Sequence, residues 1–448
     1  MDKNSSIDWK KFKSKIRYLP SIENWSDPDF VEPAEFLVST SRSKQRSLLY
    51  CEPYCGAYLE LIRMDWGYSA AYEAGLEMVA ETSDPEGLSG AILYTSEASG
   101  MHHKAVTLLR SLEQRFPSNP VVKLRLAQAL ASNGQFPEID LLAERVLSLG
   151  KIGKWTANQW ASLLVNIQNL ERGSSFLNIL ADMGLSTAQL KLRLESFREA
   201  KCADPISSSI LNLDREPRKL AVSQKLLPGG GIFPKRISAV DGRQLPEFAL
   251  LSGSNYRVLS SLGPGVIGTA FSHIKVWEDL VRSNDEYRLV LEDDAIPYVH
   301  WGSLESLIEN SLSSELVWVN DRMSAIHGAR IQADESGVWQ PWDALGDLGS
   351  SASGVGTDGY IISRSGAEKL LGAFSEDGIL GHVDWQLAAY SIAVESGGSK
   401  RQGMLRRMRA VLGREEPVIQ SKALTTPLIY EWDHGASTTV KDPNHRPS

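Results

Sequence analysis

Three consecutive acidic residues, Glu292, Asp293 and Asp294 (the acid triplet), come directly after a short apolar run that reads as a buried strand. Carboxylates this close repel one another, so a cation nearby is expected. Because side chains alternate along a strand, Glu292 and Asp294 can point to one side and Asp293 to the other. Two carboxylates on one side suit Mg²⁺ or Mn²⁺, with water and substrate phosphate as the other ligands. The alternative is a surface turn whose acids face water or pair with Arg288 and Lys275.

Polar residues with binding chemistry also follow two other strand candidates. The segment 210–219 is a strand followed by two arginines, Arg215 and Arg218, whose guanidinium groups suit phosphate. The alternative is a solvated turn opened by Pro217. Asp241 follows a second strand, where its carboxylate can accept hydrogen bonds from a ribose or a base, although an Asp-Gly β-turn would use the same residues. Both segments are therefore interpreted as candidate parts of a nucleotide site.

The elements that must position these residues are short strands alternating with amphipathic helices, from about residue 207 onward. Helices are expected at 265–282 and at 363–374, the second with Ser363 as its N-cap. Such alternation predicts an α/β domain with a largely parallel central sheet, in which ligands bind at the carboxyl ends of the strands. The strand candidates are 208–214, 235–242, 287–294, 316–321 and 359–364.

The first 200 residues have a different rhythm, with apolar residues at helical spacing. Gly100 and Gly134 begin similar segments that lie 34 residues apart, which is the period of a tetratricopeptide helix pair. The stretch 87–150 resembles tetratricopeptide repeats, and a third pair is expected between Trp155 and Gly184. Repeats of this kind bind peptides or protein surfaces, so a protein partner is expected there. The alternative is a plain helical bundle whose internal similarity is accidental.

The length of 448 residues predicts two or three domains, and the net charge of −8 argues against a broad nucleic-acid-binding surface. A partly irregular N-terminal segment is expected at 1–70, a helical-repeat domain at 71–204 and the α/β domain at 205–448. The start of the chain lacks the apolar core of a signal peptide, and no run is apolar enough to span a bilayer. A cytoplasmic protein is therefore expected, with at most peripheral contact with a membrane.

Two further segments are less specific. The basic segment 401–414 could lie against anionic lipid or a phosphorylated saccharide, or fold as an ordinary surface helix. The chain has three cysteines, too few for a disulfide framework. Cys51 and Cys55 have no second Cys/His pair at zinc spacing, so reduced thiols are expected.

The order of the α/β segments resembles glycosyltransferase family 25, the lipopolysaccharide and collagen-galactosyltransferase family. The matching segments are ILNLDREPRK, RISAVDG, GVIGTAFSHIKVWEDLV and RLVLEDDA, followed by GTDGYIISRSGAEKLL, GHVDWQL and the late ST of HGASTTV. The resemblance covers residues from about 207 to 440 and leaves the helical first 200 residues outside. The family often has a cysteine shortly before its Ser-His pair, where this chain has Thr269 and Ala270.

The resemblance implies a GT-A fold and an inverting transfer of a hexose, usually galactose or glucose, from a UDP-sugar. It also implies a divalent cation, Mn²⁺ or Mg²⁺, at the acid triplet. The acceptor stays open among a glycan, a lipopolysaccharide or other lipid-linked saccharide, and a protein hydroxyl. The family's first-strand motif falls on Asn212, Asp214, Arg215 and Arg218, and its Ser-His pair falls on Ser272 and His273.

An inverting transfer needs a base that takes the proton of the acceptor hydroxyl as it attacks the anomeric carbon. Asp384 is the first candidate because it is expected at the start of a helix, after a strand, where it could face the sugar. Asp321 and Asp358 are the alternatives. A helix N-cap is the other role to which Asp384 is suited.

Histidine and aromatic residues supply the remaining candidates. His434 and His382 are candidates for a further metal ligand, although a lone histidine is more often a packing or surface residue. His273 is expected in mid-helix, where it orients substrate or bonds to a neighbouring carbonyl. Tyr360 and Trp385 could stack on a sugar, with core packing as the alternative. The nucleotide-sugar-binding candidates are Asn212, Asp214, Arg215, Arg218, Asp241, Ser272, His273, Asp293, Asp358 and Tyr360, and the metal candidates are Glu292, Asp294 and His434.

Two classes of function fit these observations. The first is a metal-dependent glycosyltransferase with a helical-repeat arm. The second is an interaction scaffold that keeps the glycosyltransferase fold without activity and binds partners through its repeats. The intact acid triplet and the arginines after the first strand favour the enzyme. A Mg²⁺-dependent phosphotransferase is disfavoured because the sequence contains no GXXXXGK[ST] phosphate loop.

Overall fold

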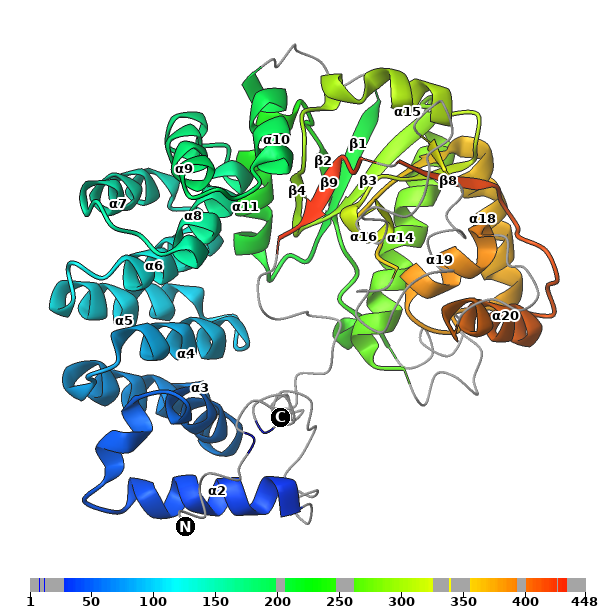
Figure 1. Ribbon diagram of the computed structural model, residues 1–448. Coiled ribbons are helices and arrows are strands. Elements are labelled where there is room, and N and C mark those ends of the chain that lie inside the picture. The colour runs from blue at the N-terminus through cyan, green and yellow to red at the C-terminus, as the bar shows by residue number, and fades with distance from the viewer. Residues whose placement is uncertain are drawn as a thin grey trace. The chain divides into compact units, whose positions relative to one another are not determined.

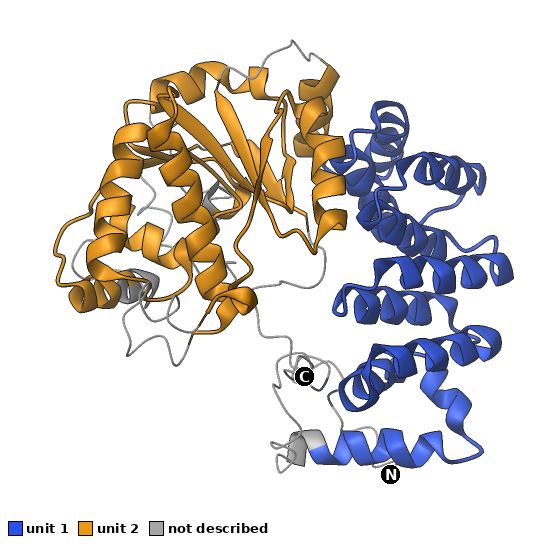
Figure 2. Ribbon diagram, turned by 180° about the vertical axis from the view of Figure 1, so that it is seen from behind, with its two compact units in different colours: residues 1–186, 434–448 blue, residues 187–433 orange. Residues whose placement is uncertain are grey.

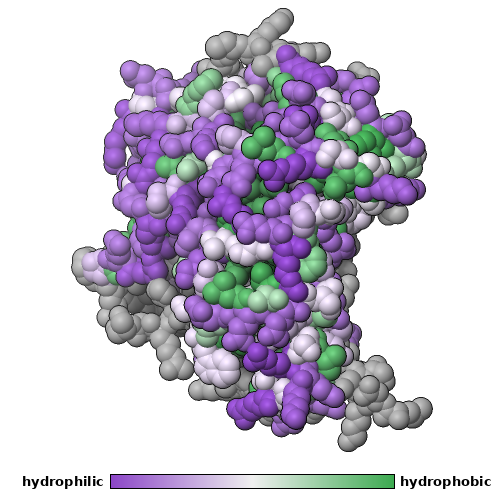
Figure 3. Space-filling model, turned by 90° about the vertical axis from the view of Figure 1, so that its left-hand side faces the viewer, coloured by the Kyte–Doolittle hydropathy of each residue, from purple (hydrophilic) through white to green (hydrophobic). Residues whose placement is uncertain are grey.

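The computed structural model describes Asp8, Phe12 and residues 28–198, 206–246, 262–324, 338–339, 355–392, 400–424 and 426–432. The chain forms two compact units (Figure 2), one of residues 1–186 with 434–448 and one of residues 187–433. In the described residues no helix is long and apolar enough to cross a membrane. On the face seen in Figure 3, hydrophobic residues gather in small groups among a hydrophilic majority.

The first unit is built from helices in the described residues (Figure 1). They are α2 (Pro28–Ser41), η3 (Arg46–Tyr50), α3 (Tyr54–Glu81), α4 (Pro85–Glu97), α5 (His102–Arg115), α6 (Pro120–Ser132), α7 (Phe136–Ser148), α8 (Lys154–Asn166) and α9 (Leu170–Asp182). The helices α4 and α5 pack together, as do α6 with α7 and α8 with α9. The predicted helix pairs in 87–150 and the third pair expected between Trp155 and Gly184 are therefore confirmed.

The internal similarity of the sequence has a structural cause in the turns. Gly100 between α4 and α5 has a φ of 65°, and Gly134 between α6 and α7 has a φ of 67°. A positive φ is the left-handed conformation that glycine adopts without steric cost and other residues rarely adopt. The two glycines therefore occupy equivalent positions in two successive helix pairs.

The borders of the units differ from the predicted domain borders. Residue 70 lies inside α3, three residues after Gly67, whose φ of 81° breaks the helix. The border between the units falls after residue 186. The helix α10 (Ala188–Arg198) therefore belongs to the α/β unit. Two contacts hold it there: the Arg193 guanidinium lies 4.1 Å from the centroid of the Tyr298 ring, and Arg193 Nε donates a hydrogen bond to the Tyr298 carbonyl oxygen.

A seven-stranded mixed sheet forms the centre of the second unit, in the order β2-β1-β3-β7-β5-β8-β6. The strands β1, β2 and β3 run parallel, whereas β7 is antiparallel to both of its neighbours. The prediction of an α/β domain is confirmed, and the sheet is more mixed than predicted. Its strands are β1 (Ser207–Asn212), β2 (Lys235–Ser238), β3 (Tyr287–Glu292), β5 (Leu316–Trp318), β6 (Val338–Trp339), β7 (Gly359–Ser363) and β8 (Ser421–Leu424), and a separate two-stranded sheet pairs β4 (Ala295–Pro297) with β9 (Ile429–Glu431).

Helices cover both faces of the sheet, so the strands carry apolar side chains on both sides. On one face, Val290 packs with α14 (Pro264–Arg282), α18 (Arg364–Asp377) and α19 (Val383–Ser391). On the other face, Leu289 and Leu291 pack among residues from α11, η4, β4, η6 and α15. The remaining bounds are α11 (Pro217–Leu226), η4 (Leu227–Gly230), η5 (Gly242–Gln244), η6 (Trp301–Ser303), α15 (Glu305–Ser311), α16 (Asp321–Ser324) and α20 (Lys400–Leu412).

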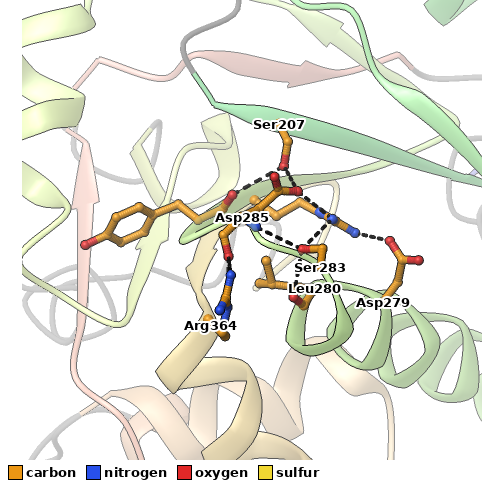
Figure 4. Close-up of polar contacts among 8 residues, drawn as sticks. Ser207, Asp279, Leu280, Ser283, Asp285 and Arg364 are labelled. Atoms are coloured by element: carbon orange, nitrogen blue, oxygen red, sulfur yellow. Dashed lines mark hydrogen bonds and ion pairs between the residues drawn. The ribbon is translucent and has the colours of Figure 1, made fainter.

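The amino end of β3 is fixed by the guanidinium of Arg288, which is 5% exposed. Its nitrogens pair with Asp279 and with Asp285, and Ser207 donates a 2.7 Å hydrogen bond to the same Asp285 carboxylate (Figure 4). Lys275 donates to the Ser238 carbonyl oxygen. Arg288 and Lys275 are therefore bound to other groups and do not pair with the acid triplet. The surface-turn alternative with these two partners is not supported.

Candidate functional site

The acid triplet lies at the carboxyl end of β3, and its side chains alternate as the strand geometry predicts. Glu292 accepts a 2.5 Å hydrogen bond from the Thr357 hydroxyl, on the side of the sheet that α14 covers. Asp293 turns the other way and accepts a 2.8 Å hydrogen bond from the Asn212 side-chain amide. Asp294 Oδ1 is buried and has no hydrogen-bond partner among the described residues. The triplet is thus anchored to the sheet edge through Glu292 and Asp293, and Asp293 and Asp294 form a half-buried turn that leads into β4.

These carboxyl groups have strongly perturbed pKa values. Burial raises the pKa of Asp293 to about 6. Burial, followed by the negative charge of Glu292, raises the pKa of Asp294 well above its usual value. Burial also acts to raise the pKa of Glu292, but contacts with His273 and Thr357 outweigh it and lower that pKa. The charge of Lys219 acts to lower the pKa values of Asp293 and Asp294, but it does not outweigh their burial.

A second group of charges lies at the neighbouring strand ends. Arg322 in α16 pairs with Glu431 of β9, and its Nε lies 3.6 Å from Asp358 Oδ1. Asp358 is 2% exposed, and neither of its oxygens has a hydrogen-bond partner among the described residues. Burial raises the pKa of Asp358 to about 8, and burial also raises the pKa of Asp321. Arg322 is thus the cation that the described structure places among these acids.

The loop after β1 is joined to the loop after β2. Arg215 donates a 2.8 Å hydrogen bond to Asp241, which also accepts from Arg243. These bonds, with that of Arg243 the strongest, lower the pKa of Asp241 despite its burial. Asp214 pairs with Arg236 and is 74% exposed. The structure therefore brings Arg215 and Asp241 together, as expected for parts of one site.

Asn212 connects this loop to the acid triplet. Its amide nitrogen donates to both Asp293 and the Glu216 carbonyl oxygen, and its amide oxygen accepts a 3.0 Å hydrogen bond from Arg236. Arg218 lies exposed in the first turn of α11. The amide of Asn212 is consequently a structural bridge between β1, β2 and the end of β3.

The Ser-His pair lies in α14 and is buried. The Ser272 hydroxyl donates to the Gly268 carbonyl oxygen and accepts a 2.8 Å hydrogen bond from the Val240 amide. His273 is 0% exposed, and its Nδ1 lies 2.8 Å from the Tyr360 hydroxyl. Tyr360 is also fully buried, which excludes stacking on a ligand and favours the core-packing alternative.

Asp384 is the second residue of α19 and not its N-cap, which is His382. The N-cap alternative for Asp384 is therefore wrong, although an acid in the first turn still suits the helix dipole. Burial raises the pKa of Asp384, and the charges of Glu292 and Arg322 act on it as well. His382 is exposed, and Trp385 packs against the core cluster beside α14. His434 lies outside the described residues.

The carboxylate oxygens near the acid triplet are the possible ligands of a cation. No group of three or more His, Cys, Asp or Glu side chains in the described ranges is arranged to hold a metal ion. However, Asp294 Oδ1 is a buried carboxylate oxygen to which no described residue donates a hydrogen bond, and a cation would satisfy it. Carboxylate oxygens suit Mg²⁺ and Mn²⁺, which commonly take one or two carboxylates together with substrate phosphates and water. The residues therefore fit a shared site of this kind and not a cage made by protein ligands alone.

Three residues that line this region were missed in the sequence. They are Thr357, which holds Glu292, and the pair formed by Arg322 and Glu431. Arg322 directly follows the strand-end acid Asp321, and that position is the one signal that could have indicated it. Glu431 carries no local signal, because its place depends on the pairing of β9 with β4.

Residues 207–325 match the sequence model of "Glycosyltransferase family 25 (LPS biosynthesis protein)". A Drosophila melanogaster protein named "Glycosyltransferase 25 family member" is 28% identical over 177 residues. Human "Procollagen galactosyltransferase 2" is 30% identical over 174 residues, and so is its mouse counterpart. Each alignment covers 37% of this chain, and the chain spans 27% of the length of these relatives.

Proposed function

We propose that the chain transfers a hexose from a nucleotide sugar to a hydroxyl group of an acceptor, because residues 207–325 of the α/β unit match the sequence model of glycosyltransferase family 25. The donor is UDP-galactose or UDP-glucose. The acceptor is a saccharide, a lipopolysaccharide or a protein, and the name of the human relative, a procollagen galactosyltransferase, supports galactose as the sugar. The reaction inverts the anomeric carbon and depends on Mn²⁺ or Mg²⁺.

The observation that carries the proposal is the buried Oδ1 of Asp294, which has no hydrogen-bond partner among the described residues and lies next to the Glu292 carboxylate. Glu292 ends β3 and Asp294 follows it, at the carboxyl end of a parallel part of the sheet, which is where such folds bind nucleotides. A bound divalent cation would stabilise the negative charge of the departing UDP. Arg215 and Asp241, joined by a hydrogen bond, lie after β1 and β2 and supply donors and acceptors for the nucleotide.

Within this proposal Asp384 takes the proton of the acceptor hydroxyl. Burial has raised its pKa, and a base whose pKa lies closer to the working pH transfers protons more efficiently. Asp321, whose pKa burial also raises, is the alternative base. Glu292 and Asp294 bear the cation, and Asn212 holds Asp293 out of the way on the other side of the strand.

The competing function is a scaffold that keeps the fold without activity. UDP, UDP-galactose and UDP-glucose should be tested for thermal stabilisation of the full chain, with and without Mn²⁺. A ligand that binds only the folded state raises the midpoint temperature of thermal unfolding. Slow Mn²⁺-dependent release of UDP from one donor, lost in Asp294→Asn, would support the enzyme.

The matched control is Asp182→Asn, at the exposed end of α9, which should release UDP at the wild-type rate. If no uridine nucleotide raises the midpoint under either condition, the enzyme proposal fails and the scaffold remains.

A further inference from the structure

A line of buried polar groups runs from the core of the α/β unit to the acid triplet. Trp277 Nε1 donates a 2.9 Å hydrogen bond to the Tyr360 hydroxyl, which lies 2.8 Å from His273 Nδ1. His273 Nε2 lies 3.5 Å from Glu292 Oε1. Trp277, Tyr360 and His273 are all 0% exposed. These side chains are therefore closed off from bulk solvent, and the polar atoms within reach of each one in the described structure are those of its neighbours in this line.

The donors and acceptors in this line determine the tautomer of His273. The indole N–H of Trp277 can only donate, so the Tyr360 oxygen accepts from it. The proton of Tyr360 then has His273 Nδ1 as its acceptor, and a neutral imidazole with Nδ1 as acceptor carries its proton on Nε2. The opposite tautomer would leave the Tyr360 proton without an acceptor. It would also direct the Nε2 lone pair at the Glu292 carboxylate, where two acceptors repel.

We propose that His273 is a positioning residue that directs its Nε2–H at Glu292 and holds this carboxylate toward the edge of the sheet. At 3.5 Å the contact is longer than the roughly 2.9 Å of a formed N–H···O hydrogen bond. Such bonds are often long in ligand-free sites and shorten when the ligand binds. His273 Nε2 has no hydrogen-bond partner among the described residues, so Glu292 is the acceptor within reach.

The consequence is that Glu292 is held from two sides. Thr357 donates to Oε1 from the strand edge, while His273 reaches the same oxygen from α14. Two donors on Oε1 leave Oε2 free for a ligand. Groups that orient a carboxylate in this way typically change the affinity for a bound metal about 10-fold to 100-fold when they are removed. This inference rests on the proposed role of Glu292 as a cation ligand, whereas the tautomer follows from the hydrogen bonds alone.

Two replacements separate the two ring nitrogens. In His273→Gln the amide reaches about as far as Nε2 and can still donate to Glu292. In His273→Asn the amide reaches only about as far as Nδ1 and keeps contact with Tyr360 alone. We expect binding of Mn²⁺ with UDP, measured by Mn²⁺ paramagnetic resonance, to weaken about 10-fold or more in His273→Asn and to stay within about 3-fold in His273→Gln. Equal losses in both variants, or no loss in either, would overturn the positioning role.

The tautomer is tested independently of any ligand. Long-range ¹⁵N–¹H spectra of the histidine-labelled full chain should show His273 as the Nε2–H form, assigned by its disappearance in His273→Gln. Tyr360→Phe, which removes the hydroxyl that selects the tautomer, should add the Nδ1–H form. An imidazolium or a pure Nδ1–H signal in the wild type would overturn this inference and leave the proposed transferase untouched. An Nε2–H signal in a chain that binds no Mn²⁺ and no UDP would overturn the proposed function instead.

Discussion

The guanidinium of Arg322 lies 3.6 Å from the carboxylate of Asp358, yet neither Asp358 oxygen has a hydrogen-bond partner in the described part of the chain. Asp358 precedes β7 directly, and its backbone oxygen accepts a hydrogen bond from the amide of Glu292. The side chain is therefore held next to the acid triplet by the sheet itself. Asp358 is almost fully buried, and the positive charge of Arg322 offsets only part of the cost of ionising it. The free energy of unfolding should therefore depend on pH.

Ionisation of Asp358 should lower the free energy of unfolding as pH rises. Asp358 has a pKa of about 8 in the folded chain, whereas an unfolded aspartate ionises near about 3.9. Folding therefore takes up a proton at Asp358 between about pH 4 and pH 8, and its contribution to stability falls as pH rises through that window. Urea unfolding of metal-free protein should show a smaller loss of stability between about pH 6 and pH 8 in Asp358→Asn than in wild type. Parallel curves would contradict the raised pKa.

The ion pair of Arg322 with Glu431 should be a coupled pair. Arg322→Met leaves Glu431 and Asp358 without their cation and should lower the free energy of unfolding by roughly 2 kcal/mol. This loss is smaller than that for a fully buried pair, because the Glu431 side chain is 40% exposed. Adding Glu431→Gln should recover part of the loss, which a double-mutant cycle measures as coupling above about 0.5 kcal/mol. The same cycle on the exposed pair of Arg282 with Glu278 should give less than about 0.5 kcal/mol. Additive losses at Arg322 and Glu431 would show that they do not interact.

Replacement of the proposed base should affect turnover and leave donor binding intact. Asp384→Asn should lower kcat about 10²-fold to 10⁴-fold with little change in KM for the UDP-sugar, because the acceptor proton loses its base. The variant keeps the shape of the side chain in the first turn of α19. Steady-state kinetics with the donor found by thermal shift would measure it. A larger loss of kcat in Asp321→Asn would transfer the role to Asp321.

Ser272 should support the site without contacting the nucleotide. Its hydroxyl is the acceptor for the Val240 amide, so Ser272→Ala leaves a buried donor unpaired and should lower the free energy of unfolding by about 1–3 kcal/mol. The affinity for UDP should stay within about twofold. In the control Ser111→Ala, the lost hydroxyl bonds only within its own helix, and stability should hardly change. Weaker UDP binding without a loss of stability would show that Ser272 contacts the nucleotide after all.

Local patterns predicted those parts of the site that depend on one segment. The alternation of Glu292 and Asp293 follows from strand geometry, and the two side chains do contact opposite sides. Ser363 caps α18 through the Gly366 amide, as predicted. The equivalence of Gly100 and Gly134 was also readable, because glycine adopts the left-handed conformation without steric cost. At the corresponding place between α8 and α9, Gln168 has a φ of 58°, so the turn favours glycine without requiring it.

Features that depend on long-range pairing could not be read in the same way. The direction of β7 is set by its partners β3 and β5, and an apolar strand reads alike in either direction. Glu431 meets Arg322 only because β9 returns to β4 at a distance of more than 100 residues in the chain. The sequence leaves Tyr360 open between stacking on a sugar and core packing, because it does not reveal that β7 lies between β3 and β5.

The position of α10 decides where the chain can be cut. Arg193 packs on Tyr298, and Ser196 accepts a hydrogen bond from the His300 amide, so this helix covers the region after β4. A fragment that begins at residue 205 would leave that region uncovered and should tend to aggregate. A fragment that begins at residue 187 would retain its natural cover and should be the better starting point for crystallising the α/β unit by itself.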